Sequence, residues 1–163
     1  MTLLPHDIGL ACDADAEPIA LLSRDAIEYG LGWKWTSGRI IRCLRDEATN
    51  VPVARADGRP IGFAIMHYRD DEAHLLLFAV SPAYRRRGVG SALLSWLETT
   101  ALTAGTGIIS LEARARNHGA RAFYRHHGYR EVAEVRGMYR GVEDGVRFAK
   151  DLWAQAPDAS RMS

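Results

Sequence analysis

Hydrophobic and polar positions divide the first half of the chain into a short strand, two helices and three further strands. Residues 3–12 read as a strand, and apolar residues recur near helical spacing over residues 16–30. Thr36 or Ser37 can cap a second helix that ends at Leu44. The segments NVPVARADG, RPIGFAIMHY and AHLLLFAV then follow with only short polar turns between them. Strands this close along the chain are expected to pair antiparallel.

The second half of the chain alternates helices with strands. VGSALLSWLETTALTAG has the pattern of an amphipathic helix, and GIISLEARA is typical of a buried strand. NHGARAFYRHHG fits a short helix that Asn117 caps and Gly128 ends. YREVAEVRGMYR and GVRFAKDLW read as two final strands. The strand–helix–strand unit over residues 75–113 requires a parallel crossover, so we expect a mixed sheet with helices on its faces.

Composition and charge limit the partners that we expect. The 163 residues suffice for one domain, which we place at residues 1–153, with a flexible tail at residues 154–163. The net charge of +1 gives no overall attraction to nucleic acid or to an anionic membrane, and no apolar run is long enough to span a bilayer. Cys12 and Cys43 match no metal-ligand spacing, so we expect reduced thiols, no bound metal and a cytoplasmic protein.

Positive charge gathers where one strand gives way to a helix, in VSPAYRRRGVGSALL. A helix that begins near Gly88 leaves its first amides without partners, and its dipole places about half a positive charge there. Glycines without a Cβ let a bulky anion reach the backbone. The segment therefore predicts a diphosphate site. Its residues are Arg85, Arg86, Arg87, Gly88, Val89, Gly90 and Ser91.

Two common nucleotide motifs do not fit this segment. A phosphate-binding loop of the Walker type needs G-x-x-x-x-G-K-[ST], which the chain lacks. A dinucleotide fingerprint needs a third glycine where Leu93 stands, and an acidic ribose partner near residues 108–110, where there is none. Nucleotide hydrolysis and dinucleotide binding are therefore not favoured.

A different pattern does fit. Arg85-x-x-Gly88-x-Gly90, after FAVSPAY and before an amphipathic helix, resembles the acetyl-CoA-binding motif of the GNAT family of N-acetyltransferases. NHGARAFYRHHGY resembles a second motif of that family, N-x-x-A-x-x-F-Y-x-x-x-G-[FY]. The matching positions are Asn117, Ala120, Phe123, Tyr124, Gly128 and Tyr129. The resemblance covers residues 50–153 and fits the first fifty residues only by the order of their helices.

The resemblance implies an α/β (α+β) fold with a mixed, mostly antiparallel sheet of six to seven strands and about four helices. It also implies that the two central parallel strands splay apart and admit the pantetheine arm of acetyl-CoA, the expected co-substrate. Asn117 would bond the pantetheine chain, and the backbone amides of residues 85–91 would hold the pyrophosphate. The strand residues expected to pair with pantetheine are Phe78, Ala79 and Val80.

The resemblance further implies acid–base roles. Tyr124 would protonate the departing sulfur, because a phenol with an ordinary pKa near 10 is protonated at pH 7. Two residues are candidates for the base. Glu112 lies in LEARARN, which resembles the L-E-V-R-x-x-N segment of the ribosomal-protein alanine N-acetyltransferase branch. His74 stands where the histone acetyltransferase branch has its catalytic glutamate. Glu112 could instead pair with an arginine, and His74 could flank a surface turn.

The function expected from these residues is acetyl transfer from acetyl-CoA to a primary amine, by direct attack in a ternary complex. The alternative is a catalytically silent coenzyme A sensor or structural module. The acceptor stays open among protein N-termini, amino acids, polyamines and aminoglycosides, and the protein is expected to be a monomer or a homodimer. Trp33 and Trp35 are either core anchors or part of an acceptor lid, and Glu28 and Tyr139 could also face the acceptor.

Overall fold

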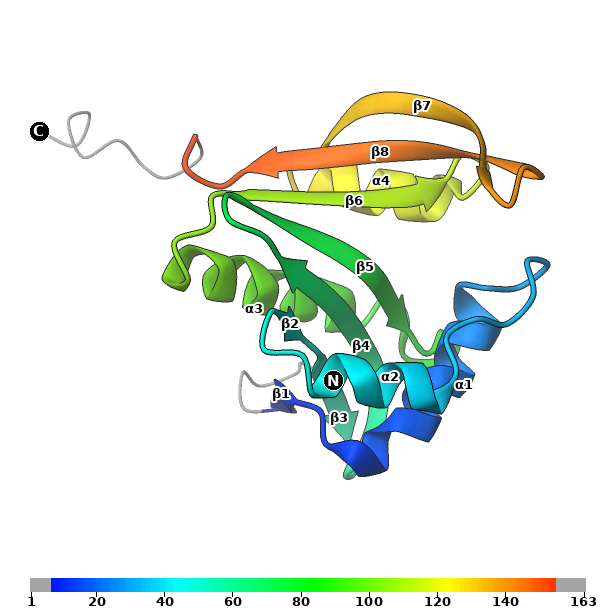
Figure 1. Ribbon diagram of the computed structural model, residues 1–163, viewed down its shortest axis with the longest axis vertical. Helices are drawn as coiled ribbons and strands as arrows, with labels where there is room; N and C mark the ends of the chain where they lie inside the picture. The colour runs from blue at the N-terminus through cyan, green and yellow to red at the C-terminus, as the bar shows by residue number, and fades with distance from the viewer. Residues whose placement is uncertain (1–6, 155–163) are drawn as a thin grey trace, which may run out of the picture.

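The computed structural model describes residues 7–154, which form a twisted sheet with helices against it (Figure 1). The strands are β1 (Ile8–Leu10), β2 (Thr49–Asn50), β3 (Pro52–Ala56), β4 (Arg59–Tyr68), β5 (Glu72–Val80), β6 (Ile108–Arg114), β7 (Arg130–Tyr139) and β8 (Glu143–Asp151). The helices are α1 (Ala16–Ala26), α2 (Ser37–Leu44), α3 (Val89–Thr103) and α4 (His118–His126), with short 3-10 turns η2 (Asp13–Asp15) and η3 (Pro82–Tyr84).

The sheet follows the order β1-β3-β4-β5-β6-β8-β7, with β2 paired to β4. Every pairing among the described strands is antiparallel except that of β5 with β6, which the α3 crossover joins in parallel. The expected mixed, mostly antiparallel sheet is therefore confirmed. Eight strands are present rather than six or seven, because β2 and β3 pair with successive parts of β4 and are counted separately.

The central strand β4 explains how helices cover both faces of the sheet. Phe63 and Ile65 point to one face and pack with Ile19 of α1 and Ile40 of α2. Their neighbours on the strand point to the opposite face, where Met66 packs in the cluster that contains residues of α3 and α4. Side chains alternate across a strand, so a continuous apolar run such as IGFAIM is buried on both sides.

The two parallel strands pair over only part of their length. Glu72–Leu75 of β5 lie beside Ile108–Leu111 of β6, and beyond these four residue pairs the strands separate (Figure 1). At the same point β5 carries an extra residue, Leu76, because Ile65 pairs with Leu77 while the next residue of β4 pairs with Leu75. A bulge bends its strand away from a regular ladder. The expected splay between the central strands is thus confirmed.

Two sequence expectations extend outside the described residues. The first strand was expected to begin at residue 3, and the tail was placed at residues 154–163, of which the structure describes only Ala154. Between residues 7 and 154, no helix combines the length and the apolar character that a membrane span requires.

Candidate active site

The turn before α3 exposes backbone amides. Gly88 precedes the helix with φ +83° and Arg86 has φ +61°, both in the left-handed region, where a glycine is favoured. No side chain of the described residues caps this helix end, and the first hydrogen bond of the helix runs from the Ala92 amide to the Gly88 carbonyl at 3.0 Å. The preceding amides of α3 therefore point outward without an intrahelical partner.

The three arginines of this turn are exposed, and they differ in the groups that they contact. Arg85 donates from Nε to the Val80 carbonyl at 3.3 Å, and the Arg87 guanidinium lies 5.6 Å from the centre of the Tyr84 ring. Arg85 and Arg86 line the adjoining groove, whereas Arg87 does not. Val89 is also absent from the groove because its side chain is buried in the core beside α3.

Gly90 has a packing role that the sequence did not indicate. A Cβ added there would lie 3.3 Å from the Phe123 ring, so the glycine lets the start of α3 approach α4 closely. Gly88, by contrast, faces open space, so a Cβ there would meet no neighbour. A residue other than glycine would nevertheless be strained at this position, because φ is positive. The two glycines therefore meet different requirements.

A groove of about 540 Å³ runs from this turn to Tyr124. One wall is the end of β5, where the three residues expected to pair with pantetheine all lie: Phe78, Ala79 and Val80. The other wall is α4 and the residues just before it. Because β5 is not paired with β6 along this stretch, backbone groups on that side of β5 are available to a ligand.

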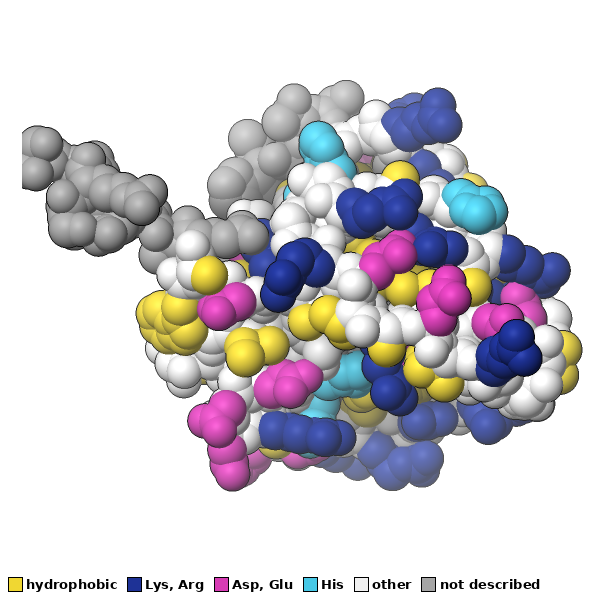
Figure 2. All heavy atoms as spheres, turned by 90° about the horizontal axis from the view of Figure 1, so that it is seen from above, with side chains coloured by type: hydrophobic (Ala, Val, Ile, Leu, Met, Phe, Trp, Pro, Cys, Tyr) yellow, Lys and Arg dark blue, Asp and Glu magenta, His cyan; other side chains and the backbone are white. Residues whose placement is uncertain are grey.

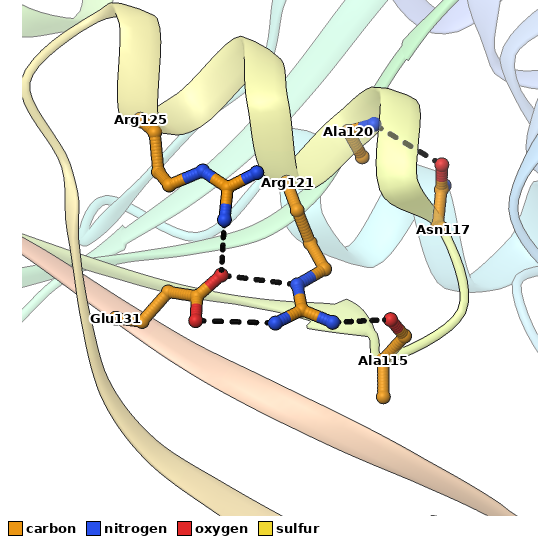
Figure 3. Close-up of polar contacts among 6 residues, drawn as sticks. All are labelled: Ala115, Asn117, Ala120, Arg121, Arg125 and Glu131. Carbon is orange, nitrogen blue, oxygen red and sulfur yellow. Dashed lines mark hydrogen bonds and ion pairs between the residues drawn. The ribbon is translucent and has the colours of Figure 1, made fainter.

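Asn117 joins the groove to the start of α4. Its side-chain oxygen accepts a hydrogen bond from the Ala120 amide at 3.1 Å, which confirms the predicted cap and leaves the side-chain NH2 as a donor (Figure 3). Arg121 holds the helix from the other side, with two bonds to Glu131 at 3.0 and 3.1 Å and one to the Ala115 carbonyl at 2.6 Å (Figure 3). Asn117 is therefore held in a fixed position at the edge of the groove.

A second cavity, of about 330 Å³, opens on the other side of Tyr124. We call it the acceptor cleft, because it contains Glu28 and Tyr139, which were expected from the sequence to face the acceptor. It lies between the loop over residues 27–35, the stretches of β5 and β6 over residues 74–78 and 111–114 where the two strands begin to separate, and the end of β7. The residues that line both this cleft and the groove are Ala26, Phe78, Asn117, Ala120 and Tyr124. The two spaces thus meet where the central strands separate.

Tyr124 is buried among aromatic rings at this meeting point. Its ring centre lies 5.4 Å from that of Phe123, 5.6 Å from Phe148 and 6.1 Å from Phe78. Burial raises the pKa of the Tyr124 hydroxyl above its ordinary value, and nearby Tyr139 raises it further. Within residues 7–154 no side chain or backbone group bonds this hydroxyl, so it is protonated at neutral pH and available to a ligand.

Both candidate bases line the acceptor cleft. Glu112 is the first residue of β6 after the paired stretch, at the opening of the splay, and Arg147 donates to its Oε1 at 3.3 Å. His74 lies within the paired stretch, where its Nδ1 is 2.8 Å from Ser110 Oγ. Burial lowers the pKa of His74, and Glu112 opposes this effect. Glu112 thus does pair with an arginine, while also facing the cleft.

The loop between α1 and α2 forms one wall of the cleft. Glu28 fixes it, because its carboxylate accepts the Lys34 amide at 2.7 Å, the Trp35 amide at 3.2 Å and the Ser23 hydroxyl at 2.9 Å. Trp35 lines the cleft and packs against the core, whereas Trp33 is exposed and does not line it. Of the two tryptophans, only Trp35 therefore lines the cleft, and its packing also fits the alternative role of a core anchor.

Arg114 is a residue of the cleft whose importance the sequence did not reveal. It is buried, donates to the Ile27 carbonyl at 2.6 Å and to Glu143 at 2.8 Å, and its guanidinium lies 4.0 Å from the Tyr29 ring centre. It thereby links the α1–α2 loop to the β7–β8 turn. Its place in LEARARN was the only signal, because the partners come from distant parts of the chain.

Comparisons with known proteins identify the family to which this chain belongs. The model of the acetyltransferase (GNAT) family matches residues 17–129, a range that includes the arginine–glycine turn, both separated strands and Tyr124. The chain belongs to this family. Among residues 7–154 no three His, Cys, Asp or Glu side chains group as metal ligands would.

Three relatives illustrate the similarity. The [ribosomal protein bS18]-alanine N-acetyltransferase of Salmonella typhimurium is 39% identical over 97 residues. The matched residues make up 58% of this chain and 66% of that enzyme, which is slightly less than two thirds of the enzyme's length. The L-2,4-diaminobutyric acid acetyltransferase of Streptomyces avermitilis is 32% identical over 88% of this chain and 78% of its own. The crystal structure of the ribosomal-protein-S18-alanine N-acetyltransferase from Escherichia coli superposes with a TM-score of 0.78 at 28% identity, covering 89% of this chain and 92% of that one.

Proposed function

We propose that the protein transfers the acetyl group of acetyl-CoA to a primary amine in a ternary complex. The observation that carries this proposal is the meeting of two separate cavities at Tyr124, where β5 and β6 part. One cavity is bounded by free helix amides and arginines, as a diphosphate requires, and the other by acid–base side chains. The names of the relatives support this reading, since each is named an acetyltransferase and one of them an alanine N-acetyltransferase.

The chain offers matching contacts for the pyrophosphate and for the pantetheine arm of acetyl-CoA. The amides at residues 85–91, with Arg85 and Arg86, suit the pyrophosphate. The unpaired edge of β5 at residues 78–80 and the Asn117 side-chain NH2 suit the amides of the pantetheine arm. Acetyl-CoA supplies an activated thioester, and the protein's part is to orient it and to move protons.

The proton transfers are assigned as follows. Glu112 accepts the proton of the attacking amine, directly or through water, because it lies at the opening of the splay while His74 lies deeper and is held by Ser110. A backbone N–H of β5 near Val80 stabilises the charge that develops on the carbonyl oxygen. Tyr124, which its raised pKa keeps protonated, donates a hydrogen bond and then its proton to the departing thiolate. Glu112 afterwards releases its proton to solvent and Tyr124 regains one from solvent, so the enzyme returns to its starting state.

We place the reaction in the cytoplasm, which agrees with the free state of both cysteines, Cys12 and Cys43. The partners are acetyl-CoA and the amine acceptor, with no role for nucleic acid.

The test is thiol release from acetyl-CoA with a panel of amines that includes peptide N-termini, amino acids, polyamines and aminoglycosides. We expect release with at least one class, and a loss of about 100-fold in kcat for Tyr124→Phe with unchanged coenzyme binding by calorimetry. Binding of coenzyme without release for any amine would instead establish the silent sensor. Unchanged turnover in Tyr124→Phe would remove Tyr124 from the acid role.

A further inference from the structure

Two cations from different parts of the chain line the acceptor cleft. Lys34 belongs to the α1–α2 loop, and Arg140 follows directly after β7. Both are exposed at the cleft rather than buried beneath it. We call this pair the cationic rim.

The backbone fixes Arg140 across the mouth of the cleft. Arg140 has φ +56°, a left-handed conformation that is uncommon for a residue other than glycine. Its guanidinium lies against the α1–α2 loop, because a Cβ added at Gly32 would be 2.8 Å from Arg140 Nη1. The side chain therefore spans from the β7–β8 turn to the opposite wall.

The other charged groups of the cleft already have partners. Glu112 pairs with Arg147, Arg114 pairs with Glu143, and the Glu28 carboxylate is bonded to backbone amides. Neither the Lys34 ammonium nor the Arg140 guanidinium forms an ion pair with any acidic residue in the described part of the chain. The rim thus presents unpaired positive charge to whatever enters.

This charge is a local feature of the cleft. On the side of the molecule formed by β7 and β8, Figure 2 shows basic and acidic side chains interspersed rather than a continuous basic face. With a net charge of +1, the whole protein does not attract anions at long range. Selection by the rim therefore acts on a group that has already entered the cleft.

We propose that the cationic rim binds a carboxylate of the acceptor, so that preferred acceptors carry a primary amine together with a carboxylate. This rests on the proposed acetyl transfer and names its substrate class. An arginine fork suits a carboxylate in particular, since it can donate two parallel hydrogen bonds. The charged groups of polyamines and aminoglycosides are all cations, so these acceptors are repelled by the same rim. The carboxylate can come from an acidic side chain beside a peptide N-terminus or from a free amino acid.

The test compares acceptor pairs that differ only in the carboxylate. Three peptides of equal length with amidated C-termini begin Ala-Asp, Ala-Ala and Ala-Lys, and 2,4-diaminobutyrate is compared with its carboxamide. Binding is measured with the full chain saturated with coenzyme A, which has no acetyl group to transfer. We expect the acid member of at least one series to bind about tenfold tighter than its neutral partner. Which series shows the effect identifies the source of the carboxylate. Equal binding within both series overturns the proposal.

Variants assign the preference to the rim. Arg140→Glu and Lys34→Glu are expected to remove the preference for the acid and to favour the Ala-Lys peptide. Arg136→Glu is the matched control, because Arg136 is an exposed arginine of β7 that does not line the cleft, and it is expected to bind like the parent. A preference that survives in the Arg140→Glu, Lys34→Glu double variant overturns the assignment.

The same samples separate this proposal from the proposed function. Charge-selective binding without thiol release from acetyl-CoA would leave the rim established and the transferase activity refuted. Thiol release at equal kcat/KM for the acidic, neutral and basic acceptors would leave the activity established and the rim refuted.

Discussion

At the scale of single residues, Tyr124 combines two properties that usually exclude each other. Its ring is part of the aromatic core, yet its hydroxyl lies where two cavities meet and has no partner in the described residues. Burial disfavours the charged phenolate far more than the neutral phenol. The same packing that stabilises the fold therefore holds the proposed acid in its protonated form.

The choice between the two candidate bases leads to a prediction at this scale. Glu112→Gln is expected to lower kcat by about 100-fold or more, while His74→Gln lowers it by less than about tenfold. The reason is position, since only Glu112 lies at the opening of the splay. The measurement is kcat against pH for both variants and the parent.

The acid side of that profile distinguishes the residues further. The pKa of His74 is lowered by burial, so a profile governed by His74 would lose activity only below the ordinary histidine range, and His74→Gln would abolish that limb. A larger loss for His74→Gln than for Glu112→Gln would make His74 the base.

Single positions also show what the sequence could predict. Asn117 was predicted as a cap and is one, because a cap depends on residues three positions apart. Gly90 was assigned to ligand access alone, and its contact with Phe123 was missed because that ring comes from another helix. The roles assigned to Tyr124, Glu112 and His74 stay predictions until the variants are measured.

At the scale of elements, one buried ion pair fastens the start of the chain to the sheet. Asp15 of η2 accepts two bonds from Arg55 of β3, at 2.7 and 2.6 Å, and one from the Cys12 amide at 2.8 Å. The bond from Arg55 is the main cause that lowers the pKa of Asp15 from 3.8 to about 2. The Asp15 side chain is 6% exposed, so solvent weakens this pair little.

This pair predicts a loss of stability in acid. A carboxyl with a lowered folded pKa contributes stability above its unfolded pKa of 3.8, and that contribution disappears as the pH falls toward about 2. The lowered pKa corresponds to about 2 kcal/mol. Asp15→Asn is therefore expected to lower the free energy of urea unfolding by at least about that amount at pH 7 and to flatten its dependence on pH between about 4 and 2.

The control for this prediction is Asp25→Asn. Asp25 pairs with Arg24 on the surface, where both side chains are largely exposed, and its loss is expected to leave unfolding unchanged. Equal effects of the two substitutions would contradict the role given to the η2–β3 pair.

Elements were predictable from sequence where their pattern is local. The segment RPIGFAIMHY coincides with β4, and the helices over residues 36–44 and 117–128 are present within a residue or two. The bulge at Leu76 and the division between β2 and β3 were not predicted from the residues, because both depend on register with β4. The contacts of Arg114 and Arg140 were missed for the same reason, since they join loops far apart in sequence.

At the scale of the whole molecule, the sheet consists of two halves that share a short seam. One half contains β1 to β5, the other β6 to β8, and the four residue pairs between Glu72–Leu75 and Ile108–Leu111 join them. Coenzyme bound in the groove would contact β5 of the first half and also α4, the helix that connects β6 to β7 in the second half. It is therefore expected to stabilise the whole fold and not only the turn that holds its diphosphate.

This expectation can be measured by thermal unfolding. Coenzyme A at one hundred times its Kd is expected to add about 2.7 kcal/mol to the free energy of unfolding. In Ser91→Asp the added carboxylate stands in the first turn of α3, where it favours the helix but repels a diphosphate. The variant should thus keep or raise the Tm of the free protein and lose the shift given by coenzyme A. An undiminished shift would contradict the site at residues 85–91.

The chain passes between the halves of the sheet at one place within residues 7–154, the link at residues 104–107 from α3 to β6. Two continuous stretches of sequence therefore supply the two halves of the sheet. Recombination at this link would exchange the β7–β8 hairpin, and Arg140 with it, while the segment that carries the arginine–glycine turn stays intact. The exchanged segment would also contain Asn117 and Tyr124, so a chimaera keeps the donor groove only if the incoming segment has equivalents of both residues.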